Sequence, residues 1–184
     1  FWCQEAALIG KLFVRRKKIS LKIWISGQDA RAGNHLVPWI KPKPNELMSM
    51  SDFLAGEFEK NHKIRPGHIV PNGIDPSLTL NLANVRDIDI LGVGSLIPLK
   101  QYSVFIDIVY NLAKSNGSLK VVLVGDGIEK EKLLSKIRSL KLEDNIELAG
   151  TLSHQEVLKL TTRAKVFLHP SAYEGFSTAC LEAL

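Results

Sequence analysis

Cysteine is scarce in this sequence, which holds only Cys3 and Cys180 in 184 residues, far apart and without CxxC or Cys/His ligand spacing. A disulfide framework or a structural zinc site is therefore not expected, because both need several such residues at regular spacings. Two thiols fit a reducing, cytosolic setting, although they could pair with each other. No segment approaches 18 uninterrupted apolar residues, so a membrane-spanning helix is not predicted.

Aromatic residues are also few, at 7% of the chain. Binding to single-stranded nucleic acid would need basic residues interleaved with stacking aromatics, and none of the recognition motifs for nucleic acid occurs. A nucleic-acid partner is therefore not predicted. The formal net charge of +5 still indicates an anionic partner, such as phosphate groups or acidic lipid.

The hydrophobic content of 45% over 184 residues can form one large domain or parts of two. The chain starts at Phe1 rather than Met and stops at Leu184 within a helical pattern, so we expect a fragment of a longer polypeptide, truncated at both ends. No secretory signal is predicted, because the opening residues lack the basic, apolar and small-residue regions of one.

Strand and helix patterns alternate through the second half of the chain. Short apolar, β-branched runs are separated by segments with helical periodicity, which is the signature of a doubly wound parallel α/β sheet. Ser153 and Glu156 stand in the spacing of a capping box and predict a helix start there. The expected strands are 89–94, 119–125, 145–150 and 165–170, and the expected helices are 100–115, 129–140, 154–164 and one that opens near Ser177.

The pattern of the first half indicates the end of another α/β domain. We expect helices at 4–14 and 52–61, the second capped by Ser51, and strands at 21–26, 46–50 and 68–70. Two prolines and a glycine in PNGIDPS, 71–77, then mark a boundary. The predicted domains are residues 1–75 and residues 76–184.

Ligands of α/β sheets normally bind beyond the carboxyl ends of the strands, so the loops there are the candidate site. The loop GVGSLIPLK offers Gly92 and Gly94 for close backbone approach and Lys100 as a positive charge. It is not a G-x-G-x-x-G dinucleotide motif, because Ile97 stands where the last glycine would be. The segment GDG, 125–127, is interpreted as a turn.

The final segment, AYEGFSTACLEAL, places Glu174 before a Gly-Phe-Ser-Thr turn and Glu182 inside the helix that follows. The free N–H groups at the start of a helix attract phosphate, and an acidic side chain can accept hydrogen bonds from a ribose diol. Glu182 would then hold ribose and Glu174 a hydroxyl-rich group beyond the diphosphate. This arrangement predicts a nucleotide-sugar ligand.

Five segments in this order and spacing resemble the donor domain of glycosyltransferase family 4: VPNGID, GVGSLIPLK, LVGDG, LAGTLSH and LHPSAYEGFSTACLEAL. That family has the GT-B fold of two facing Rossmann-like domains. The resemblance implies that residues 1–75 are the end of the N-terminal, acceptor-side domain and that residues 76–184 are the nucleotide-sugar donor-binding domain, which is incomplete. The resemblance covers nearly the whole chain, and its most specific element is the glutamate pair. It implies a retaining transferase that needs no metal and no cofactor, in which the donor's β-phosphate assists departure.

By that resemblance, Glu174 would contact the donor sugar and Lys100 the diphosphate, and these two are the catalytic candidates. Glu182 would bind ribose, and Thr151 and Leu152 would lie near the base. The other expected donor contacts are Gly94, Ser95, Gly175, Phe176, Ser177 and Thr178.

The sequence departs from the family pattern at two positions. Ser95 stands where the family usually has an arginine that partners the lysine, and Ser26 in SGQDARAGN stands where it has a histidine. The family's first glycine-rich acceptor loop and its closing segment are absent, so this fragment alone is expected to be inactive.

Other polar residues have structural interpretations beside functional ones. His154 and His169 are acid/base candidates, but their positions in a capping turn and at a strand end favour structural roles. Asp87 and Asp89 form a D-x-D sequence of the kind that binds divalent metal in another glycosyltransferase fold. Because this pair leads straight into a strand, metal binding is not predicted.

The basic run RRKK, 15–18, follows an apolar helix and is either a helix end that complements the dipole or a site that docks on an anionic membrane. We therefore predict a cytoplasmic glycosyltransferase, possible peripheral contact with the inner face of a membrane, and transfer of a sugar from a nucleotide-diphosphate sugar to a polysaccharide or lipid-linked acceptor. The alternatives are a nucleotide-sugar binding module without transfer activity, or another enzyme of the same fold such as a phosphorylase or epimerase.

Overall fold

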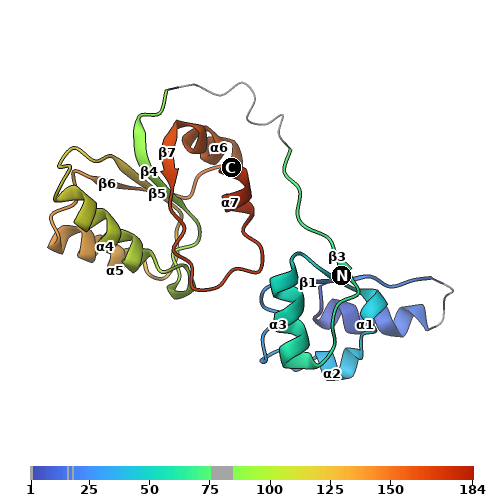
Figure 1. The fold of residues 1–184 in the computed structure, drawn as a ribbon. Helices are drawn as coiled ribbons and strands as arrows, with labels where there is room; N and C mark the ends of the chain where they lie inside the picture. The colour runs from blue at the N-terminus through green and yellow to red at the C-terminus, as the bar shows by residue number, and fades with distance from the viewer. Residues whose placement is uncertain (1, 16, 18, 76–84) are drawn as a thin grey trace. The chain divides into compact units, whose positions relative to one another are not determined.

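The structure is a computed structural model that describes residues 2–15, 17, 19–75 and 85–184, and it divides into two compact units (Figure 1). The first unit is Phe1–Gly73 with Glu174–Phe176, and the second is Ile74–Tyr173 with Ser177–Leu184. The boundary after Gly73 lies two residues before the predicted one. The short segment 174–176 is grouped with the first unit, whereas the sequence analysis assigned it to the second domain.

The first unit is built on a three-stranded parallel sheet in the order β1-β2-β3. Its elements are α1 (Glu5–Val14), β1 (Ile23–Ile25), α2 (Val37–Ile40), the 3-10 turn η1 (Pro44–Glu46), β2 (Leu47–Ser49), α3 (Asp52–His62) and β3 (His68–Ile69). The predicted helices and strands of this half are confirmed, with each end at the predicted residue or within two residues of it. The four-residue helix α2 was not predicted, because it is too short for a helical period to show.

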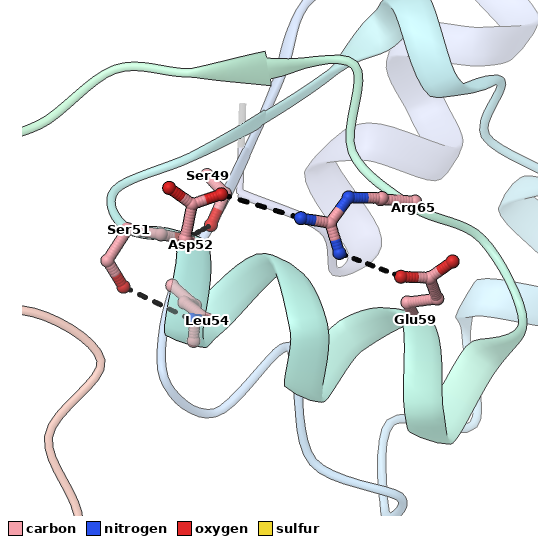
Figure 2. A network of polar contacts seen from close by, with 6 residues as sticks. All are labelled: Ser49, Ser51, Asp52, Leu54, Glu59 and Arg65. Atoms are coloured by element: carbon pink, nitrogen blue, oxygen red, sulfur yellow. Dashed lines mark hydrogen bonds and ion pairs between the residues drawn. The ribbon is translucent and has the colours of Figure 1, made fainter.

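Helix α3 begins where the sequence indicates. Ser51 is its N-cap, and its side chain accepts a hydrogen bond of 3.1 Å from the Leu54 amide. Arg65 reaches back over the helix and donates to Glu59 at 2.8 Å and to Asp52 at 3.4 Å (Figure 2). These ion pairs are exposed and stabilise the unit weakly, so the buried apolar residues hold α3 in place. That core includes Ile23, Ile25, Leu47, Leu54 and Phe58, all without exposed surface.

The second unit contains a four-stranded parallel sheet in the order β6-β5-β4-β7. Its elements are β4 (Ile88–Val93), the 3-10 turn η3 (Pro98–Lys100), α4 (Tyr102–Ala113), β5 (Val121–Val124), α5 (Lys130–Ser139), β6 (Ile146–Gly150), α6 (His154–Arg163), β7 (Ala164–Phe167) and α7 (Thr178–Glu182). The predicted doubly wound α/β sheet is confirmed, with every predicted strand and helix of this half present. Residues 76–84, which precede this sheet in the chain, lie outside the described residues.

Both faces of this sheet are covered. Val121 and Leu123 pack into a core that contains residues of α4 and α5, including Phe105 and Ile137. The alternate residues of β5 belong to a second cluster, with side chains of α6 packed against it. Because side chains of a strand alternate between faces, the two clusters lie on opposite sides of the sheet (Figure 1). All four residues of β5 are buried, as expected for a central parallel strand.

The strand order creates a switch point beside β4. The chain runs outward from β4 through β5 to β6 and then returns to the other side of β4 as β7. Loops that leave β4 and β7 therefore diverge at the carboxyl edge, which is where open α/β sheets bind ligands. The loops in question are 94–101 and 168–177. Within the described part of the chain, no helix is long and apolar enough to cross a membrane.

Candidate functional site

Glycines line the carboxyl edge of the second sheet and bring three loops together. The Gly94 amide donates to the Val124 carbonyl at 3.0 Å, and the Gly125 amide donates to the Gly150 carbonyl at 2.8 Å. Gly125 has a φ of +142°, and a Cβ at this position would lie 1.9 Å from the Gly94 carbonyl oxygen. Only glycine allows this approach, so this part of the edge consists of backbone.

Lys100 lies in the loop after β4, at the end of η3. Its amide donates to the Ile97 carbonyl at 3.0 Å, which closes the turn. A Cβ on Gly94 would lie 3.8 Å from Lys100 Cε, so the lysine side chain folds back over the end of β4. Ser95, in the same loop, is exposed. The structure thus places a half-buried cation beside the switch point, together with the predicted contacts Gly94 and Ser95.

The segment after β7 approaches the same loop. The Ala172 amide donates to the Leu99 carbonyl at 3.0 Å, which joins the two diverging loops directly. Ser177 caps α7, and its hydroxyl accepts a 3.3 Å hydrogen bond from the Cys180 amide. The same hydroxyl lies 3.5 Å from His169 Nε2. The predicted helix start is therefore present, and Thr178 is its first residue.

Glu182 ends α7 and contacts a residue of α6. Its Oε1 lies 2.8 Å from His154 Nε2, and its side chain is 18% exposed against 58% for His154. Sequence reasoning favoured a structural role for His154, because the residue follows the capping serine. No sequence signal could have found this pair, since its members are 28 residues apart in different elements.

The loop after β6 leads from Gly150 to α6 and contains two more predicted contacts. Thr151 is exposed, whereas Leu152 is partly buried against the core cluster of β5 and α6. Any contact of Leu152 with a ligand is therefore limited to its backbone and the exposed part of its side chain. The predicted capping box is confirmed, because Glu156 accepts hydrogen bonds from the Ser153 amide at 2.8 Å and hydroxyl at 2.6 Å. These hydrogen bonds lower the pKa of Glu156.

Glu174, Gly175 and Phe176 fall in the first unit. The Ser51 hydroxyl donates to the Gly175 carbonyl at 2.7 Å, and Phe176 packs against the first core. The other predicted contacts belong to the second unit, whereas these three are grouped with the first. The predicted role of Glu174 on the donor sugar therefore stays a prediction.

The D-x-D pair lies at the opposite edge of the second sheet. Asp87 precedes β4 and accepts two hydrogen bonds from Arg163, at 2.8 Å and 2.5 Å, which hold the pKa of Asp87 at about 2. Asp89 accepts from the Lys120 amide at 2.8 Å and from the Lys165 ammonium at 2.7 Å. Both carboxylates are therefore engaged in ion pairs away from the carboxyl edge.

The predicted acceptor-side loop follows β1 in the first unit. The Ser26 amide donates to the buried Asp29 carboxylate at 2.7 Å, and the Asp29 amide faces the Ser26 hydroxyl at 3.4 Å. Burial, and then the charge of Asp29, raises the pKa of the Cys3 thiol to about 12. Cys3 is therefore held as a neutral thiol inside this unit and serves packing rather than reactivity.

Comparison with known proteins identifies the family and the fold of this chain. The sequence model of the family Glycosyl transferases group 1 matches residues 81–184. The 2-deoxystreptamine N-acetyl-D-glucosaminyltransferase of Niallia circulans is 30% identical over 94 residues, which are 51% of this chain and 24% of that enzyme. An N-acetylgalactosaminyltransferase of Campylobacter jejuni that acts on a diphospho-undecaprenol-linked saccharide is 28% identical over 155 residues, which are 81% of this chain and 41% of the enzyme.

Solved structures share the fold of the chain. The Anabaena protein HepE, crystallised with UDP and glucose, superposes with a TM-score of 0.71 at 21% identity, over 98% of this chain and 54% of that one. The pneumococcal O-GlcNAc transferase GtfA, crystallised with UDP and GlcNAc, gives a TM-score of 0.67 at 17% identity, over 94% of this chain and 42% of that one. Both likenesses confirm the α/β fold of GT-B type. Because the family model matches more than half of the chain, this chain belongs to the glycosyl transferases of group 1.

Proposed function

We propose that this chain is the sugar-donor part of a glycosyltransferase that transfers a hexose or related sugar from a nucleotide-diphosphate sugar to a glycan or lipid-linked acceptor. The proposal depends mainly on the switch point of the second unit, where the hydrogen bond from Ala172 to Leu99 joins the loops after β4 and β7. Lys100 projects a cation there, as a diphosphate requires. Family membership and structural neighbours crystallised with UDP support the same ligand class.

The proposed roles follow the position of each residue. Lys100 binds the diphosphate, and Glu182 accepts hydrogen bonds from the ribose hydroxyls. Thr151 and the backbone of Leu152 border the base, because they leave β6 at the same edge. Glu174 contacts the transferred sugar. The remaining proposed contacts are Gly94, Ser95, Gly175, Phe176, Ser177 and Thr178.

The finer mechanism is proposed from the family resemblance. The enzyme belongs to family 4, retains the anomeric configuration, and needs neither metal nor cofactor, so Lys100 alone among the predicted contacts neutralises the diphosphate. Ser95 stands in place of a second cation, and it can donate only one hydrogen bond where an arginine offers five. We therefore expect donor affinity to depend strongly on Lys100.

The test is a calorimetric titration of the chain with UDP and UDP-sugars, compared with Lys100→Ala. Removal of a charge-assisted hydrogen bond should weaken UDP binding by about tenfold or more. Lys159→Ala, which changes an exposed lysine of α6, is the matched control and should bind UDP as the unchanged chain does. Loss of binding in both variants, or in neither, would contradict the donor site. In the full-length protein, donor that binds tightly but is never hydrolysed or transferred would favour the binding-module alternative.

We also propose peripheral contact with an anionic membrane at the cytoplasmic face, through the groove between α1 and α2. This groove has a volume of about 470 Å³, and its walls combine exposed apolar side chains with basic ones. Leu12 is 56% exposed and Trp39 76% exposed. The basic residues of the groove are Lys11, Arg15, Lys41 and Lys43, of which Lys11 pairs with the groove's Glu46 at 2.6 Å. Such a mixture of apolar and basic side chains suits a bilayer that carries acidic lipid.

Sedimentation with lipid vesicles tests this contact. Vesicles of phosphatidylcholine that contain about 30% phosphatidylglycerol should retain the chain. Vesicles of phosphatidylcholine alone should retain much less of it. Trp39→Ser should reduce retention, whereas Phe53→Ser, at an exposed aromatic on α3, is the control. Equal retention by both kinds of vesicle, or an equal effect of both variants, would refute the proposal.

A further inference from the structure

The inference concerns the hydrogen bond between His154 and Glu182, and it rests on the proposed role of Glu182 at the ribose. Glu182 lies in α7 (Thr178–Glu182), and its side chain is directed at a residue of α6. A glutamate side chain has three rotatable bonds and loses rotamer freedom when it is held in one position. A second point of attachment, on another element, therefore limits the positions that the carboxylate can occupy.

His154 supplies that attachment from a well-anchored position. It is the first residue of α6, and the capping box of Ser153 and Glu156 holds the backbone on which it stands. Within the second unit, the His154 ring extends from α6 to the Glu182 side chain of α7. A carboxylate only accepts hydrogen bonds, so Nε2 must be the protonated nitrogen that donates to Oε1 at 2.8 Å.

The bond leaves Glu182 able to serve a ligand. It engages Oε1, while each carboxylate has two oxygens with about four lone-pair sites. The Glu182 side chain is only 18% exposed, so its charge is partly desolvated and gains from a fixed donor. His154 also follows directly on the loop of Thr151 and Leu152, which we place beside the base. One hydrogen bond thus links the loop proposed for the base to the carboxylate proposed for the ribose.

We infer that His154 is a positioning residue for nucleotide binding, which holds the Glu182 carboxylate in the orientation that accepts the ribose hydroxyls. It acts through Glu182 and needs no contact of its own with the nucleotide. Loss of the imidazole should therefore weaken only those ligands that carry the ribose hydroxyls. A purely structural role in capping α6 would weaken all ligands alike.

The experiment measures the affinity of the chain for UDP and for 2′,3′-dideoxy-UDP, which lacks both hydroxyls. His154→Ala should weaken UDP binding by roughly three- to tenfold, as for one charge-assisted bond that water can reach, and leave the dideoxy analogue unchanged. His154→Gln, whose amide can still donate to Glu182, should recover most of the loss. Gln155→Ala, the exposed neighbour on α6, is the matched control, and circular dichroism verifies that each variant is folded.

Two further variants separate this inference from the proposed function. Glu182→Ala should abolish the preference for UDP over the dideoxy analogue, and adding His154→Ala to it should change nothing more, because the two residues act through one interaction. If the unchanged chain has no such preference or binds no UDP, the proposed function fails and this inference fails with it. If Glu182→Ala abolishes the preference but His154→Ala weakens neither ligand, or both equally, the positioning role alone is overturned.

Discussion

Gly125→Ala is expected to destabilise the second unit strongly, because the sheet edge there is closed by backbone alone. A Cβ at this position would lie 1.9 Å from the Gly94 carbonyl oxygen and 2.9 Å from its carbon. The φ of +142° is also one that only glycine adopts readily. The clash involves main chain on both sides, so no side-chain rotation can relieve it.

The magnitude follows from these two costs. The backbone conformation alone costs an alanine about 1–2 kcal/mol. Relief of the clash requires the loops to separate. This separation strains two backbone hydrogen bonds, from Gly94 to Val124 (3.0 Å) and from Gly125 to Gly150 (2.8 Å), and costs about 1 kcal/mol for each. The total is a loss of about 3–4 kcal/mol in the free energy of unfolding. With a urea m-value of about 2 kcal/mol/M, the midpoint should fall by about 1.5–2 M.

Substitutions at two other glycines in the same unit separate the cost of the backbone conformation from the cost of the clash. Gly150 has a φ of +69° and open space around its Cβ position, so Gly150→Ala should show the conformational cost alone, about 1 kcal/mol. Gly117 has neither a positive φ nor a neighbour within 4 Å. Gly117→Ala should therefore be neutral, or stabilising by about 0.5 kcal/mol through the unfolded chain.

Urea unfolding followed by far-UV circular dichroism measures the series. The three tryptophans, Trp2, Trp24 and Trp39, all lie in the first unit, so their fluorescence gives an internal reference for the part that is not mutated. The dichroism midpoint should fall in the order Gly117→Ala, Gly150→Ala, Gly125→Ala, while the tryptophan transition stays in place. If Gly125→Ala unfolds at the same urea concentration as Gly117→Ala, the argument from backbone closure is wrong.

Two further predictions concern titration and reactivity. Hydrogen bonds from Arg163 lower the pKa of Asp87 from its ordinary 3.8 to about 2, so this pair contributes stability above pH 4 that is lost as the pH falls toward 2. The free energy of unfolding measured against pH should therefore differ between the unchanged chain and Asp87→Asn at pH 6 and converge near pH 2; a difference that persists at pH 2 would contradict this. Burial raises the pKa of Cys3 to about 12, so a thiol reagent at pH 8 should modify Cys180 in the folded chain and reach Cys3 only on unfolding. Equal reaction rates for both thiols in the folded chain would refute this, as mass spectrometry of the labelled peptides can tell.

The sequence by itself determined the local elements of this protein. Apolar runs such as Val121–Val124 formed strands, since they bury both faces of a parallel sheet. Ser51, Ser153 and Ser177 each cap the helix that the sequence indicated, because a serine hydroxyl satisfies amides two or three residues away and needs no distant partner. The glycine turns after the strands were visible for the same local reason.

Tertiary structure decided the rest. The strand order β6-β5-β4-β7, and with it the switch point, depends on how the helices pack on the two faces, which no local pattern encodes. The approach of Gly125 to Gly94, the partial burial of Leu152 and the bond between His154 and Glu182 join residues that are distant in sequence or depend on the packed core. Such contacts form only when the hydrophobic core brings their elements together, and a sequence read one segment at a time cannot place them.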